Sequence, residues 1–385
     1  MMQYVEYRIL KYLLLYVPPI LLLLGTIGNI LSFVILMRRS MRKLSTYIYL
    51  AVLSITDTLV LYIGLLRLWI GELSGFELKN QTDWICKLIS VAGYTVSDYS
   101  VWLIIAVTVE RYVAVCYPLQ ATSMCNLKRA MCVIFCLLLA MFLVNFHFFW
   151  TVQIREYNIL GEVFYKCEGA PRYSYLVSEV WPWVDAILYS FLPFFIITVL
   201  NIFIIRQVIN ARKSRHEMQS IVNDHPRRES SIKLTIMLLT ISFAFLLTTL
   251  PMNIYLIGAA FIQTSDDLRF ISRVQLVRTI TELLMYVNHS MNFYLYCATG
   301  QKFRHNLLLV LCHRFGYFEN RSSALMMDRS QSQSQNNVNH ITRRTEDSEL
   351  LTFTEYAPNG SRKKPFLIAE VQRGNYVQMK ICSRD

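Results

Sequence analysis

The sequence predicts an all-α membrane protein: a seven-transmembrane helix bundle with an amphipathic eighth helix and a disordered cytoplasmic tail. Of its 385 residues, 54% are hydrophobic and 17% are charged, whereas an average soluble domain carries about 25% charged residues. The hydrophobic residues are gathered in seven long runs. Because hydrocarbon offers the backbone no hydrogen-bond partner, runs of this kind cross a bilayer as helices.

Each run is long enough to cross the hydrocarbon, which takes about 20 residues. The expected spans are residues 13–37, 47–70, 85–115, 128–150, 180–208, 231–262 and 273–298. They imply one bundle domain at 13–299, with a short extracellular segment at 1–12 before it and an amphipathic helix at 300–315 after it. The remaining tail, 316–385, is polar and rich in Gln, Ser and Asn, so we expect it to be disordered.

Basic residues are concentrated in one set of the loops between the spans. That set carries Arg38, Arg39, Lys128, Arg129 and the dense run 212–228, whereas the opposite loops mix acids and bases. The positive-inside rule therefore predicts a multi-pass plasma-membrane protein with its amino terminus outside and its carboxyl terminus in the cytoplasm. The net charge of +12 follows from this asymmetry and a basic tail, so it does not indicate nucleic-acid binding.

Two cysteines lie on the expected outer side, Cys86 at the start of the third span and Cys167 in the loop before the fifth. That side is oxidising, so we expect a disulfide that pins the loop across the bundle entrance. Asn80 begins an Asn-Gln-Thr sequence there and is a candidate glycosylation site, although closeness to the membrane works against the transferase. On the inner side, Cys312 is either palmitoylated or an unmodified interfacial cysteine. No cysteine spacing indicates a metal site.

The third span ends in Glu110-Arg111-Tyr112. A guanidinium group within hydrocarbon costs on the order of 3 kcal/mol, so its place at the inner end of a span needs a reason. We expect a switch, in which Glu110 holds Arg111 while the bundle is closed. Arg111 is then released when the bundle opens to a cytoplasmic partner.

The sequence contains a set of short motifs. They occur in the same order, and on the same spans, as in one large family of membrane proteins. They are Gly28-Asn29, Asp57, Cys86, Glu110-Arg111-Tyr112 with Pro118, Pro193, Phe245 with Pro251, Asn292 with Tyr296, and Phe303-Arg304. No single motif is specific, but the whole set in register is. Residues 13–315 therefore resemble a rhodopsin-like (class A) G-protein-coupled receptor and, more narrowly, invertebrate neuropeptide receptors of the FMRFamide type.

The resemblance implies a receptor and not an enzyme. An extracellular ligand would lead the chain to activate a heterotrimeric G protein, and receptor kinases and arrestin would act on the tail. The residues to which the resemblance assigns coupling and switching are Glu110, Arg111, Tyr112, Phe245, Pro251, Asn292 and Tyr296. Because a proline kinks a helix, Pro251 converts a small rearrangement near the ligand into a large movement of the inner end.

Several polar residues lie inside the spans, where each needs a partner. Ser100 precedes Arg111 by eleven residues and therefore lies on nearly the same helix face, which points into the bundle. The resemblance implies an allosteric sodium ion in the inactive state. Its ligands would be Asp57, Ser100, Asn288 and Asn292. The alternative is an interhelical hydrogen-bond network without an ion.

Three positions depart from the family pattern. Thr249 stands where a tryptophan is usual, Phe293 replaces the proline after Asn292, and residues 131–149 contain no tryptophan. These departures concern the way in which a ligand triggers the switch, and not the fold. We expect Met252 or Tyr286 to take the place of the missing indole.

The ligand class is narrowed by exclusion. Residues 274–299 contain no lysine for a retinal Schiff base. The position of the acid that aminergic receptors need is Gly93, and Asp98 is turned about 140° away from that face. The few residues before the first span are too short for a ligand-capturing domain. No repeated half or filter loop indicates a transporter or a channel.

What remains is an outer mouth with charged and aromatic side chains. The candidate ligand-binding residues are Arg67, Tyr94, Asp98, Asp185, Tyr189, Met252, Tyr255, Arg278, Glu282 and Tyr286. We expect a small peptide whose amide or acidic end meets the arginines while its basic group meets Glu282 or Asp185. Two alternatives stay open: an Arg67–Glu282 ion pair that only ties two helices, and a small non-peptide ligand anchored by Asp98 or Asp185.

Overall fold

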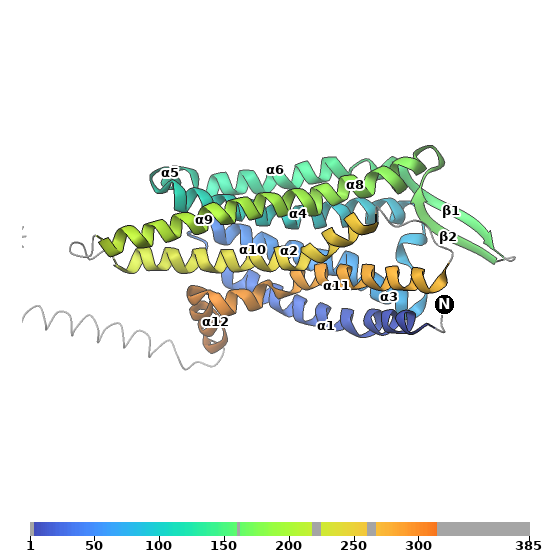
Figure 1. Cartoon of the computed structure of the whole chain (residues 1–385), viewed down its shortest axis with the longest axis horizontal. Helices are drawn as coiled ribbons and strands as arrows, with labels where there is room; N and C mark the ends of the chain where they lie inside the picture. The colour runs from blue at the N-terminus through green and yellow to red at the C-terminus, as the bar shows by residue number, and fades with distance from the viewer. Residues whose placement is uncertain (1–3, 160–161, 218–224, 260–266, 314–385) are drawn as a thin grey trace, which may run out of the picture. The chain divides into compact units, whose positions relative to one another are not determined.

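Long helices make up most of the chain, and one β-hairpin is inserted between them (Figure 1). The computed structural model describes residues 4–159, 162–217, 225–259 and 267–313. The expected tail at 316–385 and the side chain of Cys312 lie outside the described part, as do the side chains of the basic run 212–228.

Seven helical segments correspond to the expected spans. They are α1 (Val5–Leu36), α2 with η1 and α3 (Ser45–Val60, Leu61–Leu66 and Arg67–Ser74), α4 (Asp83–Cys116), α6 with α7 (Leu127–Asn145 and Phe148–Thr151), η4 with α8, η5 and α9 (Leu176–Val180, Trp181–Asp185, Ala186–Phe191 and Leu192–Glu217), α10 (His225–Ala259) and α11 (Leu268–Thr299). The shorter elements are η2 (Leu78–Asn80), α5 (Pro118–Met124), β1 (Val152–Ile159), β2 (Glu162–Gly169), η3 (Pro171–Tyr173) and α12 (Gln301–His313).

Six of these segments are long and apolar enough to cross a membrane, judged on the described residues. The seventh, α11, is 32 residues long, which suffices at about 1.5 Å per residue, but polar side chains interrupt it. Those of Asn288, His289 and Asn292 are buried. Polar residues that face the interior of a bundle avoid lipid, so hydropathy alone underrates this helix.

Two helix ends differ from the spans expected from hydropathy. α1 begins at Val5, so helix already covers most of the segment expected before the bundle. α9 continues to Glu217. Hydropathy marks only the part of a helix that lies in hydrocarbon, whereas the hydrogen-bonded turns continue beyond it.

The loop before the fifth span forms an antiparallel hairpin that the sequence did not predict. Val152 at the start of β1 pairs with Gly169 at the end of β2, and Ile154 pairs with Cys167. The strands follow directly after α7, so the hairpin begins where the fourth span ends.

Two spans contain π-helical turns in the half that is nearer the hairpin. η1 lies immediately before Arg67, and η5 lies between Asp185 and Pro193. Proline cannot donate a backbone hydrogen bond, and a wider π turn is one way in which a helix accommodates such a break. A third π turn, η4, lies before Trp181 at the start of the same span as η5.

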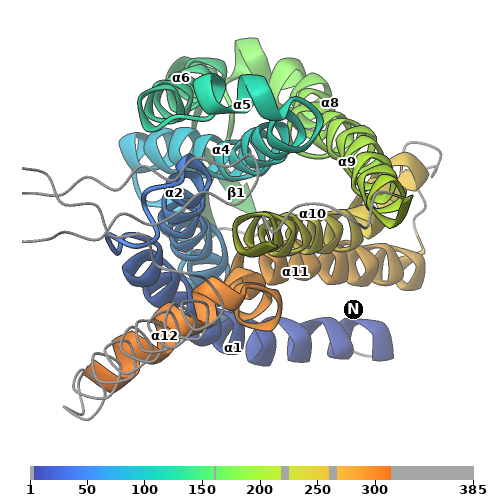
Figure 2. The same ribbon diagram turned by 90° about the vertical axis from the view of Figure 1, so that its left-hand side faces the viewer.

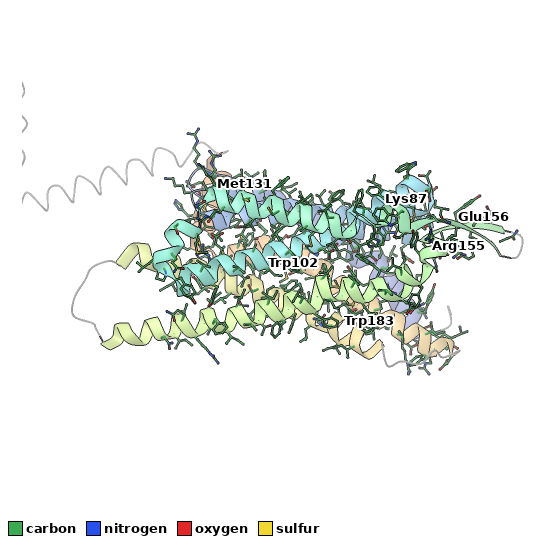
Figure 3. The ribbon with its side chains drawn as sticks, turned by 90° about the horizontal axis from the view of Figure 1, so that it is seen from above. Lys87, Trp102, Met131, Arg155, Glu156 and Trp183 are labelled. Atoms are coloured by element: carbon green, nitrogen blue, oxygen red, sulfur yellow. A yellow bond between two sulfur atoms is a disulfide. The ribbon has the colours of Figure 1, made fainter. Side chains whose placement is uncertain are left out.

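α4 is the central helix, since it contacts α2, α6, α9 and α10. The end-on view shows α4 beside α2 and α6, and α10 beside α11 (Figure 2). The Trp102 indole N–H of α4 donates to the Leu188 carbonyl oxygen of η5 at 3.2 Å. Met131 and Trp183 lie on the outside of the helices (Figure 3). Large exposed apolar side chains suit a surface that faces lipid.

Candidate functional site

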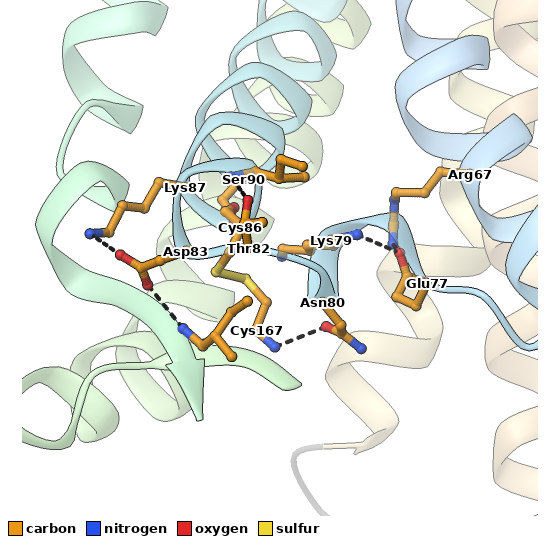
Figure 4. Close-up of a disulfide and its surroundings, with 12 residues drawn as sticks. Arg67, Glu77, Lys79, Asn80, Thr82, Asp83, Cys86, Lys87, Ser90 and Cys167 are labelled. Carbon is orange, nitrogen blue, oxygen red and sulfur yellow. Dashed lines mark hydrogen bonds and ion pairs between the residues drawn. A yellow bond between two sulfur atoms is a disulfide. The ribbon is translucent and has the colours of Figure 1, made fainter. Parts of the chain in front are cut away.

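A disulfide holds the hairpin to the start of α4 (Figure 4). Cys86 and Cys167 are bonded, with their Cα atoms 5.5 Å apart, so the predicted disulfide is confirmed. Two hydrogen bonds reinforce it: Asp83 Oδ1 accepts from the Ile154 backbone N–H at 3.1 Å, and Asn80 Oδ1 accepts from the Cys167 backbone N–H at 2.9 Å. Glycosylation at Asn80 stays a prediction. We call the end of the bundle that carries the hairpin the outer end, and the end that carries Arg111 the inner end.

The charged residues expected at the outer end form two separate ion pairs. Arg67 Nη1 lies 2.6 Å from Glu77 Oε1, and Arg278 Nε lies 2.8 Å from Glu282 Oε1 one turn along α11. The alternative Arg67–Glu282 ion pair is therefore wrong. Arg67 pairs with Glu77 because of Gly75, which ends α3 with a φ of 68°. That left-handed turn, which glycine adopts freely, brings the chain back so that Glu77 meets Arg67.

Lys79 is a second cation beside Arg67 and Glu77 (Figure 4). It is half-buried in the short η2 turn, and its backbone N–H donates to Glu77 Oε1 at 3.2 Å. Burial, together with the nearby Arg67, lowers the pKa of Lys79 to about 8 although Glu77 opposes the shift. The charge at this corner therefore changes near neutral pH.

Two carboxyl groups come together from α4 and α8. The ring of Tyr94 stacks on Phe148 and meets Trp181 edge-on at 6.2 Å between centroids. Asp98 follows Tyr94 by one helical turn, Asp185 follows Trp181 by one turn, and both helices run toward the inner end. The two carboxyl groups therefore lie about one turn below the aromatic contact, within electrostatic range of each other.

Asp98 is the more enclosed of the two acids, with 1% of its surface exposed. Its Oδ2 atom accepts a hydrogen bond from Asn145 Nδ2 at 2.9 Å, whereas its Oδ1 atom has no partner within the described residues. A buried oxygen without a donor costs about 1–3 kcal/mol. This atom can therefore accept one further hydrogen bond.

The other candidate ligand-binding residues surround these acids. Arg278 lies within electrostatic range of Tyr94 and Tyr255, and Arg67 and Glu282 lie within range of Tyr286. Met252 Sδ accepts from the Thr281 hydroxyl at 3.4 Å, which joins α10 to α11. Tyr189 is buried within range of Asp98, Asp185 and Tyr286. The structure thus brings the predicted set together, although its binding role stays a prediction.

Asp57 is the centre of a buried polar network between three helices, α2, α4 and α11. Its Oδ1 atom accepts from the Ser100 hydroxyl at 2.6 Å and lies 2.8 Å from His289 Nδ1. Its Oδ2 atom accepts from Asn292 Nδ2 at 2.7 Å. Asn288 does not join this network, because its buried Nδ2 atom has no partner in the described part of the chain. Three of the four expected residues therefore meet, and His289 takes the place of the fourth.

These surroundings do not fit the expected sodium ion. An alkali cation needs oxygen atoms whose lone pairs face it. A carboxylate only accepts hydrogen bonds, so His289 must carry its proton on Nδ1 and Asn292 must present its amide N–H groups. A cation at Asp57 would meet these hydrogens. The geometry fits the alternative, a hydrogen-bond network without an ion.

His289 also connects this network to the outer half of the bundle. Its Nε2 atom accepts from the Tyr189 hydroxyl at 3.2 Å, and its carbonyl oxygen accepts from Asn29 Nδ2 at 3.1 Å. One imidazole therefore joins the fifth, seventh and second spans. Sequence reasoning missed His289, although a histidine within a span is itself a signal of function.

Arg111 at the inner end is held by α2. Glu110 Oε1 accepts from the hydroxyls of Ser45 at 2.5 Å and Thr46 at 2.8 Å, and the Thr46 oxygen accepts in turn from Arg111 Nη2. The direct Glu110–Arg111 ion pair that we expected is absent from the described residues. A hydroxyl bridge replaces it, which explains how the guanidinium stays buried. Tyr112 points elsewhere, with its ring 6.1 Å from that of Phe203 on α9.

The sixth span contains a proline, Pro251, and a side-chain hydrogen bond to its own backbone at the same level. The hydroxyl of Thr249 donates to the carbonyl oxygen of the fully buried Phe245 at 2.8 Å. Such a bond one turn back bends helices, and the missing N–H of Pro251 weakens the same region. Nearer the inner end, the hydroxyls of Thr108 and Ser242 lie 3.3 Å apart and hold α10 to α4.

The departure at Phe293 is accommodated by glycine. A Cβ atom added to Gly28 would lie 2.9 Å from the Cβ of Phe293, so only glycine lets α1 approach α11 this closely. The ring of Phe293 packs 5.9 Å from Phe303 of α12. Tyr296 also packs on Phe303 at 5.3 Å, and its buried hydroxyl has no partner among the described residues.

Helices long enough to span a membrane, the disulfide between α4 and the hairpin, and the polar network around Asp57 together define a seven-helix membrane receptor. Residues 28–296 match the family of seven-transmembrane receptors of the rhodopsin type. The match covers well over half of the chain. The chain therefore belongs to the rhodopsin family of seven-transmembrane receptors.

Three receptors illustrate its relatives. The FMRFamide receptor of Drosophila melanogaster is 30% identical over 307 residues, which are 76% of this chain and 52% of that receptor. The chain thus spans about half the length of this relative. The growth hormone secretagogue receptor type 1 of Homo sapiens is 28% identical over 319 residues, 80% of this chain and 83% of that receptor. An FMRFamide peptide receptor of Caenorhabditis elegans is 26% identical over 302 residues, 76% of this chain and 67% of that receptor.

Proposed function

We propose that the chain is a plasma-membrane receptor for a small extracellular peptide and that the bound peptide makes it activate a heterotrimeric G protein. In this proposal the outer end faces the extracellular medium and the inner end faces the cytoplasm. The names of the relatives support a peptide ligand, since two are receptors for FMRFamide peptides. The positive-inside rule supports the orientation.

The observation that carries the proposal is a hydrogen-bonded path in the middle of the bundle, from Tyr189 to Asn292. It runs from Tyr189 to His289 at 3.2 Å and from His289 to Asp57 at 2.8 Å. Tyr189 follows Asp185 by about one helical turn. A ligand that contacts the acids can therefore move Tyr189 and, through it, the polar centre.

The inner half of the bundle carries the conformational change from this path to the G protein. Asp57 accepts a hydrogen bond from Asn292 on α11 at 2.7 Å, and α11 packs against α10. When α10 bends at Pro251 and its inner end swings outward, the Thr108–Ser242 contact opens. The Thr46 hydroxyl then releases Arg111, whose guanidinium becomes free to bind the G protein.

A peptide with one basic and one amidated or acidic end suits the charges at the outer end. The acids Asp98 and Asp185 are placed for the basic group, and Arg67 and Arg278 for the opposite end. Each arginine already has a carboxylate partner. Such a peptide therefore competes with an existing pair, which exchanges one ion pair for another at small net cost.

The test is nucleotide exchange on G proteins in membranes from cells that express the chain. A library of amidated peptides is added, and membranes without the receptor serve as the control. We expect at least one peptide to stimulate exchange through the parent receptor. Transport or ionic current without nucleotide exchange would contradict the proposal. Receptor kinases and arrestin belong to the same proposal, and agonist-dependent phosphorylation of the tail tests them.

The second candidate is a receptor for a small non-peptide cation. The unpartnered Oδ1 atom of Asp98 favours it. Two matched variants separate the candidates, because Arg67→Gln removes a charge at the mouth and Asp98→Asn removes one deep in the bundle. A peptide receptor loses potency in both variants, whereas a receptor for a small deep-bound cation loses potency only in Asp98→Asn.

A further inference from the structure

A cavity opens at the inner end, between the turn that follows α1 and the helix α12. Its volume is about 440 Å³. The residues that line it are Arg38, Arg39, Ser40, His305, Asn306 and Leu309. None of them belongs to the ligand-binding set, to the Asp57 network or to the hydroxyl bridge at Arg111, so the function described above does not use this cavity.

The surroundings of the cavity are strongly electropositive. Residues 37–44 and 300–313, which contribute the lining, contain no Asp or Glu, and the basic residues of 37–44 form no ion pair within the described part of the chain. Arg39 is exposed, without a hydrogen-bond partner among the described residues. Uncompensated basic side chains around one concave site attract anions.

The floor of the cavity is fixed in place by Asn306. Its backbone carbonyl oxygen accepts from Arg38 Nη1 at 3.2 Å, and its side-chain Oδ1 accepts from the Ser40 hydroxyl at 2.7 Å. Its Nδ2 atom donates to the Lys302 carbonyl oxygen at 2.9 Å. Both the oxygen and the nitrogen of the Asn306 side-chain amide are therefore held by hydrogen bonds. Arg38 is thus held by one N–H while its other N–H groups are left for an anion, which reduces the entropy lost on binding.

We propose that this cavity binds the phosphorylated headgroup of an anionic phospholipid in the inner leaflet. A guanidinium presents paired N–H donors that match phosphate oxygens, and Arg38 and Arg39 place two such groups at one site. His305 adds a ring N–H on the other wall. Basic pockets on the cytoplasmic side of membrane helices bind lipid headgroups in this way.

Apolar residues beside the cavity favour a lipid over a soluble phosphate. Leu309 forms part of the lining, and Leu308, the next residue along α12, is 59% exposed. An acyl chain can cover these side chains while the headgroup occupies the basic pocket. The proposal uses the inward orientation of this end that the proposed function assumes.

The test is lipid titration of the full-length receptor in nanodiscs. The discs contain phosphatidylcholine alone or with increasing phosphatidylinositol 4,5-bisphosphate, and thermal stability without any peptide is the readout. The variants are Arg39→Gln and the double variant Arg38→Gln/Arg39→Gln. The matched control is Lys128→Gln/Arg129→Gln, which removes two exposed basic residues at the start of α6.

We expect the lipid to raise the melting temperature of the parent, with apparent affinity about fivefold weaker for each basic residue removed from the cavity. The control should bind as the parent does. Equal losses in control and cavity variants would overturn the proposal, because they would show diffuse attraction only. Soluble inositol 1,4,5-trisphosphate that binds as tightly as the lipid would overturn the lipid assignment. Arg39 makes no contact that folding needs, so its variant stays informative if the double variant misfolds.

This readout separates the inference from the proposed function. Both faces of a nanodisc are open to lipid, so the stability measurement depends on neither orientation nor agonist. A receptor that ignores every peptide can still bind the lipid. Conversely, an active receptor whose melting temperature does not respond to the lipid contradicts the inference alone.

Discussion

The Nδ1 atom of His289 lies 2.8 Å from the Oδ1 atom of Asp57 in the middle of the bundle. The imidazole thus donates a hydrogen bond to the carboxylate for which the family resemblance implies a sodium ion. With Ser100 and Asn292, three hydrogen-bond donors surround this one acid. Both oxygens of the Asp57 carboxylate thus have partners among the protein's own side chains, and the network reaches the outer half of the bundle through Tyr189.

Sodium should therefore have no effect on the parent receptor. We expect agonist affinity to stay the same when sodium chloride is replaced by N-methylglucamine chloride at equal ionic strength, because N–H donors occupy the carboxylate. In His289→Ser, which replaces an N–H donor by a smaller hydroxyl, agonist affinity should become dependent on sodium. Sodium-dependent affinity in the parent that Asp57→Asn abolishes would contradict this account.

Tyr189→Phe should reduce signalling more than binding. The substitution removes only the hydroxyl that donates to His289, a bond worth about 1 kcal/mol, so we expect the half-maximal agonist concentration to rise about fivefold. Radioligand affinity for an antagonist should change little. The matched control is Tyr62→Phe, whose exposed hydroxyl only accepts a 3.4 Å bond from Thr26. An equal shift in both variants would argue against the path through Tyr189.

Thr46→Val should raise the basal activity. The variant keeps the shape of the side chain but removes the hydroxyl that joins Arg111 to Glu110. The loss of about 1–2 kcal/mol from the resting state shifts the equilibrium toward the active state about 5- to 30-fold. Nucleotide exchange without agonist measures this basal activity. Ser45→Ala removes a hydrogen bond to Glu110 alone, so its basal activity should rise less, and the opposite order would contradict the bridge.

Lys79 should make thermal stability dependent on pH. Burial lowers its pKa from 10.5 to about 8, so between these values the unfolded chain binds a proton that the folded chain does not. Raising the pH through this window therefore favours the folded state. Below pH 8 both states are protonated, and the cost of the buried charge is fully present.

The measurement compares Lys79→Met with the parent at pH 7 and at pH 10. We expect the variant to have the higher melting temperature at pH 7 and this advantage to shrink at pH 10. Lys166→Met at an exposed position of β2 is the control and should show no such change. A constant difference between Lys79→Met and the parent would show that burial does not shift this pKa.

Loss of the disulfide should weaken agonist binding. Cys167→Ser frees β2 from α4 and leaves the Asn80 and Asp83 hydrogen bonds as the only described links at that point. Because an unpinned loop must be ordered on binding, agonist affinity should fall about tenfold. Cys132→Ser, at an exposed free cysteine, is the control. Unchanged affinity in surface-expressed Cys167→Ser would show that the hairpin does not help to bind the ligand.

The sequence predicts the helices, the disulfide and most of the buried polar centre, because each has a local signal. Hydropathy marks a span, and two cysteines on one side of the membrane mark a bond. Ser100 and Asp57 could be brought together because helical periodicity puts Ser100 on the face that points inward.

Contacts that depend on chain reversal or on the packing of distant helices could not be predicted in the same way. Arg67 pairs with Glu77 because Gly75 turns the chain back, a backbone event that no charge pattern shows. Thr46 bridges Arg111 and Glu110 only because α2 packs on α4 at that level.

The most direct measurement is peptide-stimulated nucleotide exchange through the parent and through Arg111→Ala, compared at equal amounts of receptor on the cell surface. Since Arg111 is the group that the resting bundle holds through Thr46, we predict that exchange is stimulated in the parent and is lost or strongly reduced in the variant. If Arg111→Ala supports the same agonist-stimulated exchange as the parent, the account of this receptor is contradicted.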